Sequence, residues 1–268
     1  DGIALGQEAL GGAVSSGNDN IAIGCFAGHK MTSGSTNITI GKGAAGSSTI
    51  TGSNNIIMGH CAAMCITSAS HNILIGDCAA SMNTVTGEYN TAVGKQSLCK
   101  LSSGYFNVAL GWMAGGNITD QSANTFIGMA AGSFTNQYGN TAVGHCAGRG
   151  NRDGAQNVAI GQAAGPAGVG TGSYNVHVGA CAGCKTTLGD SNVFLGFKAG
   201  KETTTGSNNI AIGSSVEVSS PTGSNQLAIG QGTKYWIVGN SSYNVGIGTT
   251  NPDATVNQGN TQKLAVGI

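Results

Sequence analysis

The chain has 268 residues, with 47 glycines, only 8% charged residues and a formal net charge of zero. Charged residues make up roughly 25% of an ordinary globular domain, so this chain is unusually neutral. Because Lys and Arg are not in excess, nucleic acid and acidic membrane surfaces are not expected as partners. The sequence also lacks an apolar run of the ~18 residues that a transmembrane helix needs, so membrane insertion is not expected.

One short motif recurs along nearly the whole chain. It consists of Asn, an aliphatic residue, a variable residue, a second aliphatic residue and Gly, as in residues 20–24, 37–41 and 157–161. The closing glycines lie 16 to 18 residues apart, so the repeat is about 17 residues long. They are Gly6, Gly24, Gly41, Gly59, Gly76, Gly94, Gly111, Gly128, Gly144, Gly161, Gly179, Gly196, Gly213, Gly230 and Gly248. A unit this short cannot bury an apolar face alone, and the repeat therefore predicts an all-β solenoid, or β-roll, of about fifteen stacked coils.

Each coil is predicted to contain a strand, a glycine bend, a second short strand and a polar turn. The aliphatic pair of Ile21 and Ile23 has the period of two that is typical of a strand. Alanine follows most closing glycines by three positions, as Ala27 follows Gly24, and only Ser97 and Val216 depart from this pattern up to Gly213. The pattern indicates a crowded inward site. The recurrent Asn is expected to form a ladder of hydrogen bonds between coils.

The aliphatic pairs and the alanines are assigned to the interior, and the variable middle residue of each strand to the outer face. The predicted core includes Ile21, Ile23, Ile38, Ile40, Ile73, Ile75, Ala27, Ala44 and Ala62. The middle residues are themselves seldom charged, and strands that are apolar on both faces are usually buried on both. We therefore expect identical chains to associate along this face, most simply as a parallel homotrimer.

A triangular coil of three six-residue sides is the alternative to a flattened roll of two layers. The third side would need an inward aliphatic residue, but the positions there are mostly polar, as at Ser33, Ser68, Ser103 and Asp120. The pattern therefore favours two packed sides and a polar turn.

Residues 1–232 are predicted to form the solenoid, and residues 233–268 a C-terminal β segment outside the repeat. The repeat gives way there to residues 235–239, and residues 264–266 could form a further strand. The chain opens inside a repeat without a capping segment, and solenoids need caps. We expect a window of a longer polypeptide, or a unit whose open end the next subunit covers, and either arrangement makes a filament.

The repeats between residues 4 and 230 resemble those of bacteriophage tail fibres, and are similar to the shorter head repeats of trimeric autotransporter adhesins. The segment Asn244-Val245-Gly246-Ile247-Gly248-Thr249-Thr250-Asn251-Pro252 resembles the junction that leads, in many tail fibres, to a self-cleaving endosialidase-type chaperone domain. The resemblance implies a trimeric β-roll in an extracellular or virion fibre. It says nothing about catalysis.

The eight cysteines fit best as small apolar residues, with disulfides as the alternative. The candidates for a disulfide are Cys61, Cys65, Cys78, Cys181 and Cys184. His60 and Asp77 follow closing glycines on neighbouring coils and could converge with Cys61, Cys65 and Cys78, and zinc accepts such ligands. The spacing matches no established zinc finger, so neither a metal nor a cofactor is predicted.

No catalytic residue is predicted, because the carboxylates are few and scattered. Asp120 and Asp153 occupy the same turn position two coils apart, which suits solvated turn residues better than a glycosidase pair. Three sequons begin at Asn37, Asn117 and Asn240. Asn37 belongs to the ladder, so Asn117 and Asn240 are the candidates for glycosylation.

The sequence thus predicts a non-enzymatic, self-associating subunit of an extracellular or virion filament. One alternative is a surface adhesin whose exposed aromatics contact host glycans, and a second is a spike that depolymerises polysaccharide. The aromatics that would contact glycans are Tyr89, Tyr105, Phe106, Tyr138 and Tyr174. An ice-binding solenoid is disfavoured, because no face shows a regular Thr ladder.

Overall fold

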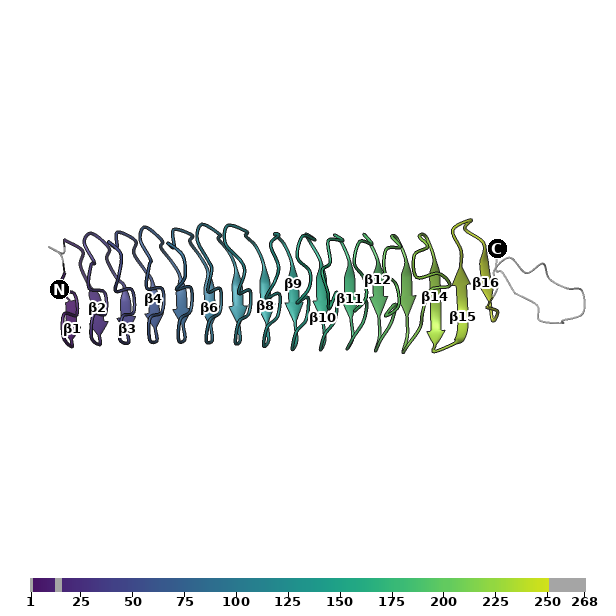
Figure 1. The fold of residues 1–268 in the computed structure, drawn as a ribbon, viewed down its shortest axis with the longest axis horizontal. Coiled ribbons are helices and arrows are strands. Elements are labelled where there is room, and N and C mark those ends of the chain that lie inside the picture. Colours follow the sequence, from purple (N-terminus) through teal and green to yellow (C-terminus); the bar gives the residue numbers. More distant parts are fainter. Residues whose placement is uncertain (1, 13–15, 251–268) are drawn as a thin grey trace, which may run out of the picture.

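The computed structural model describes residues 2–12 and 16–250, which form an elongated rod with one strand per coil (Figure 1). All sixteen strands belong to one sheet and follow one another in chain order. The first fourteen pair in parallel, and 224 residues separate the equivalent residues Ala4 and Ala228 over 13 steps. The fold is therefore the β-solenoid that the repeat predicts, with about 13 turns of about 17 residues. At a strand spacing of about 4.8 Å, the parallel stack is about 60 Å long.

The strands are short, because a bend or turn bounds each one. Their bounds are β1 Gly2–Leu5, β2 Asn20–Ile23, β3 Ile38–Ile40, β4 Ile56–Met58, β5 Ile73–Ile75, β6 Thr91–Val93, β7 Val108–Leu110, β8 Thr125–Ile127, β9 Thr141–Val143, β10 Val158–Ile160, β11 Val176–Val178, β12 Val193–Leu195, β13 Ile210–Ile212, β14 Leu227–Gln231, β15 Lys234–Gly239 and β16 Val245–Ile247. The last two pair antiparallel, β15 with β14 and β16 with β15. The parallel repeat thus ends at β14, close to the predicted boundary at residue 232. The strand predicted at residues 264–266 lies outside the described residues.

The middle residue of each strand points into the solenoid, contrary to the sequence prediction. From β2 to β14 these residues are buried, and they are Ala22, Thr39, Ile57, Leu74, Ala92, Ala109, Phe126, Ala142, Ala159, His177, Phe194, Ala211 and Ala228. The six isoleucines assigned to the core, namely Ile21, Ile23, Ile38, Ile40, Ile73 and Ile75, are instead partly exposed. Ile23 and Ile73, for example, are 36% and 37% exposed to solvent. The alanines Ala27, Ala44 and Ala62 are fully buried, as predicted.

The phase of each strand is set by the asparagine that precedes it. Asn20 is buried, and side chains alternate between the two faces of a strand, so Ala22 must also point inward and Ile21 and Ile23 outward. An aliphatic pair with period two fixes the alternation but not which face is inside. A shift of one residue moves every side chain to the other face, and this is the error in the prediction.

The segment after each glycine bend is a series of tight turns, and the second strand predicted there is not found in the described residues. The third side of the coil also supplies interior residues, which the sequence prediction missed. Met31, Ile66, Leu101 and Ile118 are buried two residues before Ser33, Ser68, Ser103 and Asp120, all of which are exposed. Parallel bridges such as Met31 to Ile50 and Ile66 to Val85 join successive coils on this side.

The predicted asparagine ladder is present and runs from Asn20 to Gln226. In each step the side-chain Oδ1 accepts the backbone N–H of the next member, at 2.8–3.1 Å. In most coils Nδ2 also donates to a turn carbonyl of the next coil, as Asn107 donates to Gln121 at 2.9 Å. One buried amide therefore fixes both the start of the next strand and the turn that precedes it.

The closing glycines are required by both conformation and space. Gly111 has a φ of 132°, which side chains with a Cβ rarely adopt, and a Cβ there would lie 2.6 Å from the carbonyl oxygen of Gly128. Successive bends therefore stack on one another only as glycines.

We expect Asn107→Ala to lower the free energy of unfolding by about 3–5 kcal/mol, because several buried groups lose their partners. The backbone and side-chain N–H groups of Asn124 lose an acceptor, and the carbonyl of Gln121 loses a donor. Chemical unfolding followed by circular dichroism measures the change. Asn117→Ala, in a partly exposed turn, is the control and should change stability by less than about 0.5 kcal/mol. Equal effects of the two substitutions would contradict the structural role of the ladder.

Candidate functional site

The outer surface of the parallel sheet carries two rows of partly exposed side chains, which we call the outer aliphatic face. One row precedes and one follows the inward residue of each strand, and both contain only Ile, Val, Leu, Met and Thr. The first row is Ile21, Ile38, Ile56, Ile73, Thr91, Val108, Thr125, Thr141, Val158, Val176, Val193, Ile210 and Leu227. The second row is Ile23, Ile40, Met58, Ile75, Val93, Leu110, Ile127, Val143, Ile160, Val178, Leu195, Ile212 and Ile229.

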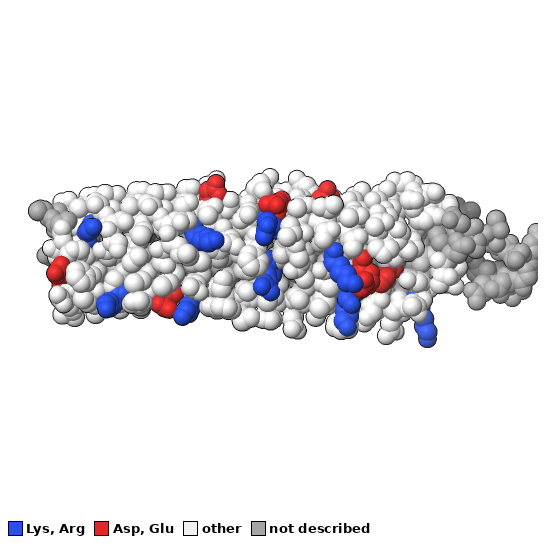
Figure 2. All heavy atoms as spheres, viewed as in Figure 1, with Lys and Arg blue, Asp and Glu red and all other residues white. Residues whose placement is uncertain are grey.

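The outer aliphatic face is large for an unpartnered surface. From β2 to β14 it measures about 60 Å by 10 Å, or about 600 Å², from standard strand dimensions. The largest apolar patch on a monomeric protein is typically about 300–600 Å². Two such faces in contact would bury about 1,200 Å², the lower limit for a stable specific interface. Charged side chains are few elsewhere as well, and on the side shown in Figure 2 they lie singly or in small groups with uncharged surface between them.

A second candidate is a group of aromatic rings in the turns of neighbouring coils, formed by His71, Tyr89, Tyr105 and Phe106. The rings of His71 and Tyr89 stack with centroids 4.9 Å apart and an interplanar angle of 2°. Tyr89 stacks on Phe106 at 5.2 Å, and Tyr105 meets Phe106 edge to face at 5.4 Å. Tyr89, Tyr105 and Phe106 remain 49–57% exposed. We call this group the aromatic cluster.

The aromatic cluster borders a surface hollow of about 260 Å³, which Thr86, Glu88 and Ser103 also line. Tyr89 and Phe106 have φ values of 58° and 56°, in the left-handed region that disfavours bulky residues. Equivalent positions in other coils have the same conformation and hold residues such as Thr36, Asn54 and Ala123, so the positive φ belongs to the repeat. Three of the five aromatics singled out in the sequence are thus brought together, whereas Tyr138 and Tyr174 lie in later coils.

The other predicted site residues lie in turns. Asp120 and Asp153 are exposed, and Asp120 accepts a hydrogen bond from Thr119 at 2.8 Å. Asn37 is buried in the ladder, as expected. Asn117 is partly exposed and accepts a hydrogen bond from Lys100 at 2.7 Å, while Oδ1 of Asn240 accepts from the backbone N–H groups of residues 242 and 244. Glycosylation at Asn117 and Asn240 stays a prediction.

All eight cysteines are free thiols in the structure, so disulfides also stay a prediction. Cys61 and Cys78 occupy the same position on adjacent coils, and Cys181 and Cys184 belong to a single coil. The structure brings His60, Asp77 and Cys78 together, with one potential ligand atom from each within 4.8 Å of the others. Cys65 is not a member of this group.

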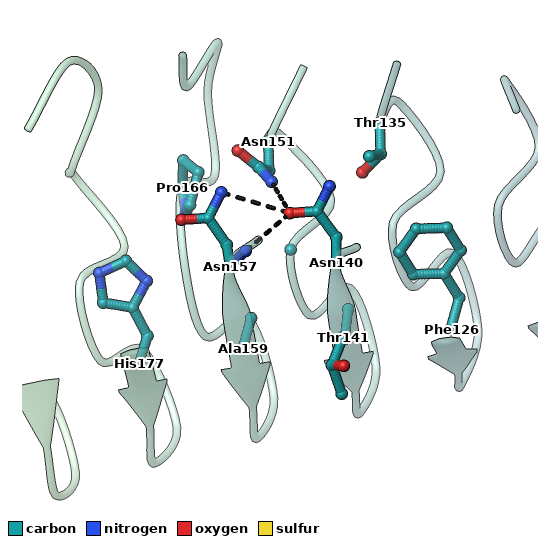
Figure 3. Close-up of a pocket in the computed structure, with 11 residues that line it drawn as sticks. Phe126, Thr135, Asn140, Thr141, Asn151, Asn157, Ala159, Pro166 and His177 are labelled. Atoms are coloured by element: carbon teal, nitrogen blue, oxygen red, sulfur yellow. Dashed lines mark hydrogen bonds between the residues drawn. The ribbon is translucent and has the colours of Figure 1, made fainter. Parts of the chain in front are cut away.

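An internal cavity lies between Phe126 and His177, where the intervening strands place only Ala142 and Ala159 in the interior (Figure 3). The centre of a water-sized sphere can occupy about 10 Å³ there, which is room for about one water molecule and not for a substrate. Asn140, Asn151 and Asn157 form a polar wall on one side of the cavity. Oδ1 of Asn140 accepts hydrogen bonds from the side chain of Asn151 and from the backbone and side chain of Asn157 (Figure 3). The cavity is therefore a packing defect with one polar wall rather than a binding pocket.

His177 is fully enclosed beside this cavity and stacks on Phe194, with centroids 5.3 Å apart. Its Nε2 has no hydrogen-bond partner in the described structure. Burial lowers the pKa of His177 to about 4, so the imidazole is neutral near pH 7.

Within the described residues, no helix is long and apolar enough to cross a membrane. Comparison with protein-family models, curated proteins and solved structures returned no match.

We expect His177 to make folding sensitive to acid. Between pH 6.5 and about 4 the unfolded chain binds a proton that the folded chain does not, so stability falls as the pH drops through this window. The loss should reach about 3 kcal/mol at pH 4 and should not grow below that. Unfolding experiments on wild type and His177→Phe across this range measure the difference. The ring of Phe194 packs on Gly200 as His177 packs on Gly183, so phenylalanine should fit. Identical pH profiles for the two proteins would contradict the assignment.

Proposed function

We propose that the protein is a non-catalytic structural subunit of an extracellular or virion fibre, and that it self-associates through the outer aliphatic face. The observation that carries the proposal is the continuous uncharged face of thirteen strands, from β2 to β14. Exposed apolar area of this extent favours association in water. The resemblance of the repeats to phage tail fibres supports a parallel trimer as the assembly, because fibre subunits of this kind align their long axes.

The rod itself suits a structural role. Every coil is joined to the next by backbone hydrogen bonds and by the asparagine ladder, so bending the rod would disturb both sets of bonds. The glycine bends stack at contact distance and add a third constraint. A stiff spacer that projects another domain needs this resistance more than it needs a pocket.

A second candidate function, a glycan-binding adhesin, is favoured by the aromatic cluster. Aromatic rings stack on the apolar faces of sugars, and Glu88 and Ser103 beside the rings offer hydrogen-bonding groups. The two functions are compatible, because the cluster lies in the turns and the outer aliphatic face lies on the strands.

Self-association is tested with Val108→Lys combined with Val158→Lys. Both side chains point outward and are only partly buried, so the substitutions add charge to the outer aliphatic face and spare the interior. We expect wild type to sediment as a trimer or a larger assembly, and the double variant to sediment as a folded monomer. Thr84→Lys combined with Val169→Lys adds the same charge at exposed turns and should assemble like wild type. A wild-type chain that is a folded monomer at micromolar concentration would rule out the proposal.

Glycan binding is tested with Tyr89→Asn and Phe106→Asn. Asparagine tolerates the left-handed backbone at both positions, so the rings are removed without adding strain. We expect binding on a glycan array to fall by about tenfold or more, because one stacked ring contributes about 1–3 kcal/mol on the scale of aromatic stacking on planar ligands. Tyr174→Asn makes the same change at the equivalent position of a distant coil and should retain binding. Equal signals from all the variants and wild type would exclude the aromatic cluster as the glycan site.

A further inference from the structure

Nitrogen, oxygen and sulfur donors meet on two adjacent coils, in the turns that follow β4 and β5. His60 and Cys61 follow the first bend, and Asp77 and Cys78 follow the second. Nδ1 of His60 lies 3.1 Å from Oδ1 of Asp77, and Sγ of Cys78 lies 3.6 Å from the same oxygen. We call His60, Asp77 and Cys78 the donor triad.

The backbone holds the donor triad in place. The N–H of Cys78 donates to the carbonyl of His60 at 2.9 Å, and the N–H of Cys61 donates to Lys42 of the preceding coil at 2.9 Å. Both turns have the same conformation, with φ values of 52° at Cys61 and 54° at Cys78. Side-chain rotation is therefore the main freedom left to the donors, and a ligand that bridges the coils would require little ordering of the chain.

Two of the three distances between the donors suit a small tetrahedral ion, and the third pair of donor atoms lies within 4.8 Å. Zinc bonds of about 2.0–2.3 Å place neighbouring ligand atoms about 3.3–3.6 Å apart, close to the 3.1 and 3.6 Å measured at Asp77. We propose that Nδ1 of His60, Oδ1 of Asp77 and Sγ of Cys78 bind a zinc-type divalent cation. A fourth position faces solvent, because the side chains of His60 and Asp77 are 58% and 42% exposed. A single carboxylate is too few oxygen ligands for calcium or magnesium.

Lys95 is the nearest charged neighbour of the triad, and a bound cation would share the carboxylate of Asp77 with it. Nζ of Lys95 lies 3.2 Å from Oδ2 of Asp77, so the other carboxylate oxygen, Oδ1, remains directed at His60 and Cys78. A cation that binds Cys78 displaces the thiol proton to solvent as the metal–sulfur bond forms.

The chain contains its own matched control in His145 and Cys146. These residues directly follow a closing glycine, as His60 and Cys61 do. The distance from the cysteine Sγ to the histidine Nε2 is 3.6 Å in this pair and 3.5 Å between Cys61 and His60. The next coil, however, offers Gln162 and Ala163 in place of Asp77 and Cys78. An isolated His–Cys pair is thus present without the donors of the adjacent coil.

Titration of the full chain with Zn²⁺ and with Co²⁺, in a non-chelating reductant, tests the proposal. We expect one tight zinc site by calorimetry, a thiolate-to-cobalt absorption band and a higher unfolding temperature with zinc. His60→Ala and Cys78→Ser should each weaken binding by at least about tenfold and abolish the cobalt band or shift it. His145→Ala and Cys146→Ser should leave the affinity and the band unchanged.

Two results would overturn the proposal. One is the absence of stoichiometric zinc binding by the reduced wild-type chain. The other is an affinity that falls equally in the Cys78→Ser and Cys146→Ser variants, which would show that cysteines bind the metal wherever they are exposed. Circular dichroism of each variant without metal establishes that the solenoid is intact, so a loss of binding can be assigned to the missing ligand.

Discussion

The structure depends on a column of buried asparagine side chains that hydrogen-bond from one coil to the next. A buried amide without partners costs free energy, so each asparagine is tolerated only where the neighbouring coil is in register. Because Oδ1 accepts the backbone N–H of the next asparagine and Nδ2 reaches the preceding turn, one side chain fixes two places on the adjacent coil. The ladder thereby specifies the spacing of the coils as well as the inward face of every strand.

The narrow interior imposes the second constraint, which is a balance of volumes within each coil. Where the strand supplies a ring, as at Phe126 and Phe194, the turn supplies Gly132 and Gly200, and a Cβ at either glycine would lie 2.3–2.5 Å from the ring. Where the strand supplies only Ala92, the turn supplies the larger Leu98. The cavity beside Asn140 arises where this balance fails over two successive coils (Figure 3). Close packing is thus achieved coil by coil.

The period of the glycines was enough to predict the solenoid, the parallel stacking, the ladder and the buried alanines, because each follows from a residue type that recurs at one position. The orientation of the strands was predicted wrongly, since alternation in Ile21 and Ile23 is compatible with either face. The ladder asparagine Asn20 lies two residues before Ala22, which puts both on the same side of the strand, but the prediction did not use this spacing to set the inward face. The row at Met31 and Ile66 was missed because the three-sided alternative was judged on the positions two residues later, at Ser33 and Ser68, whose side chains are exposed. Convergence of His60 with Asp77 followed from the period, but only side-chain geometry shows which donors meet.

A solenoid of this kind separates folding from function by position within the repeat. The inward residues and the bends determine whether a coil stacks, and the two outward positions of each strand and the exposed side chains of the turns contribute little to that requirement. The same backbone therefore carries aliphatic rows on the strands, stacked rings at Tyr89 and Phe106, and ligand atoms at His60 and Asp77. Because residues 17 positions apart lie about 4.8 Å from each other, a substitution in one turn is enough to place a new group beside an existing one. Binding sites can thus arise along the rod one coil at a time, and the interior does not have to change.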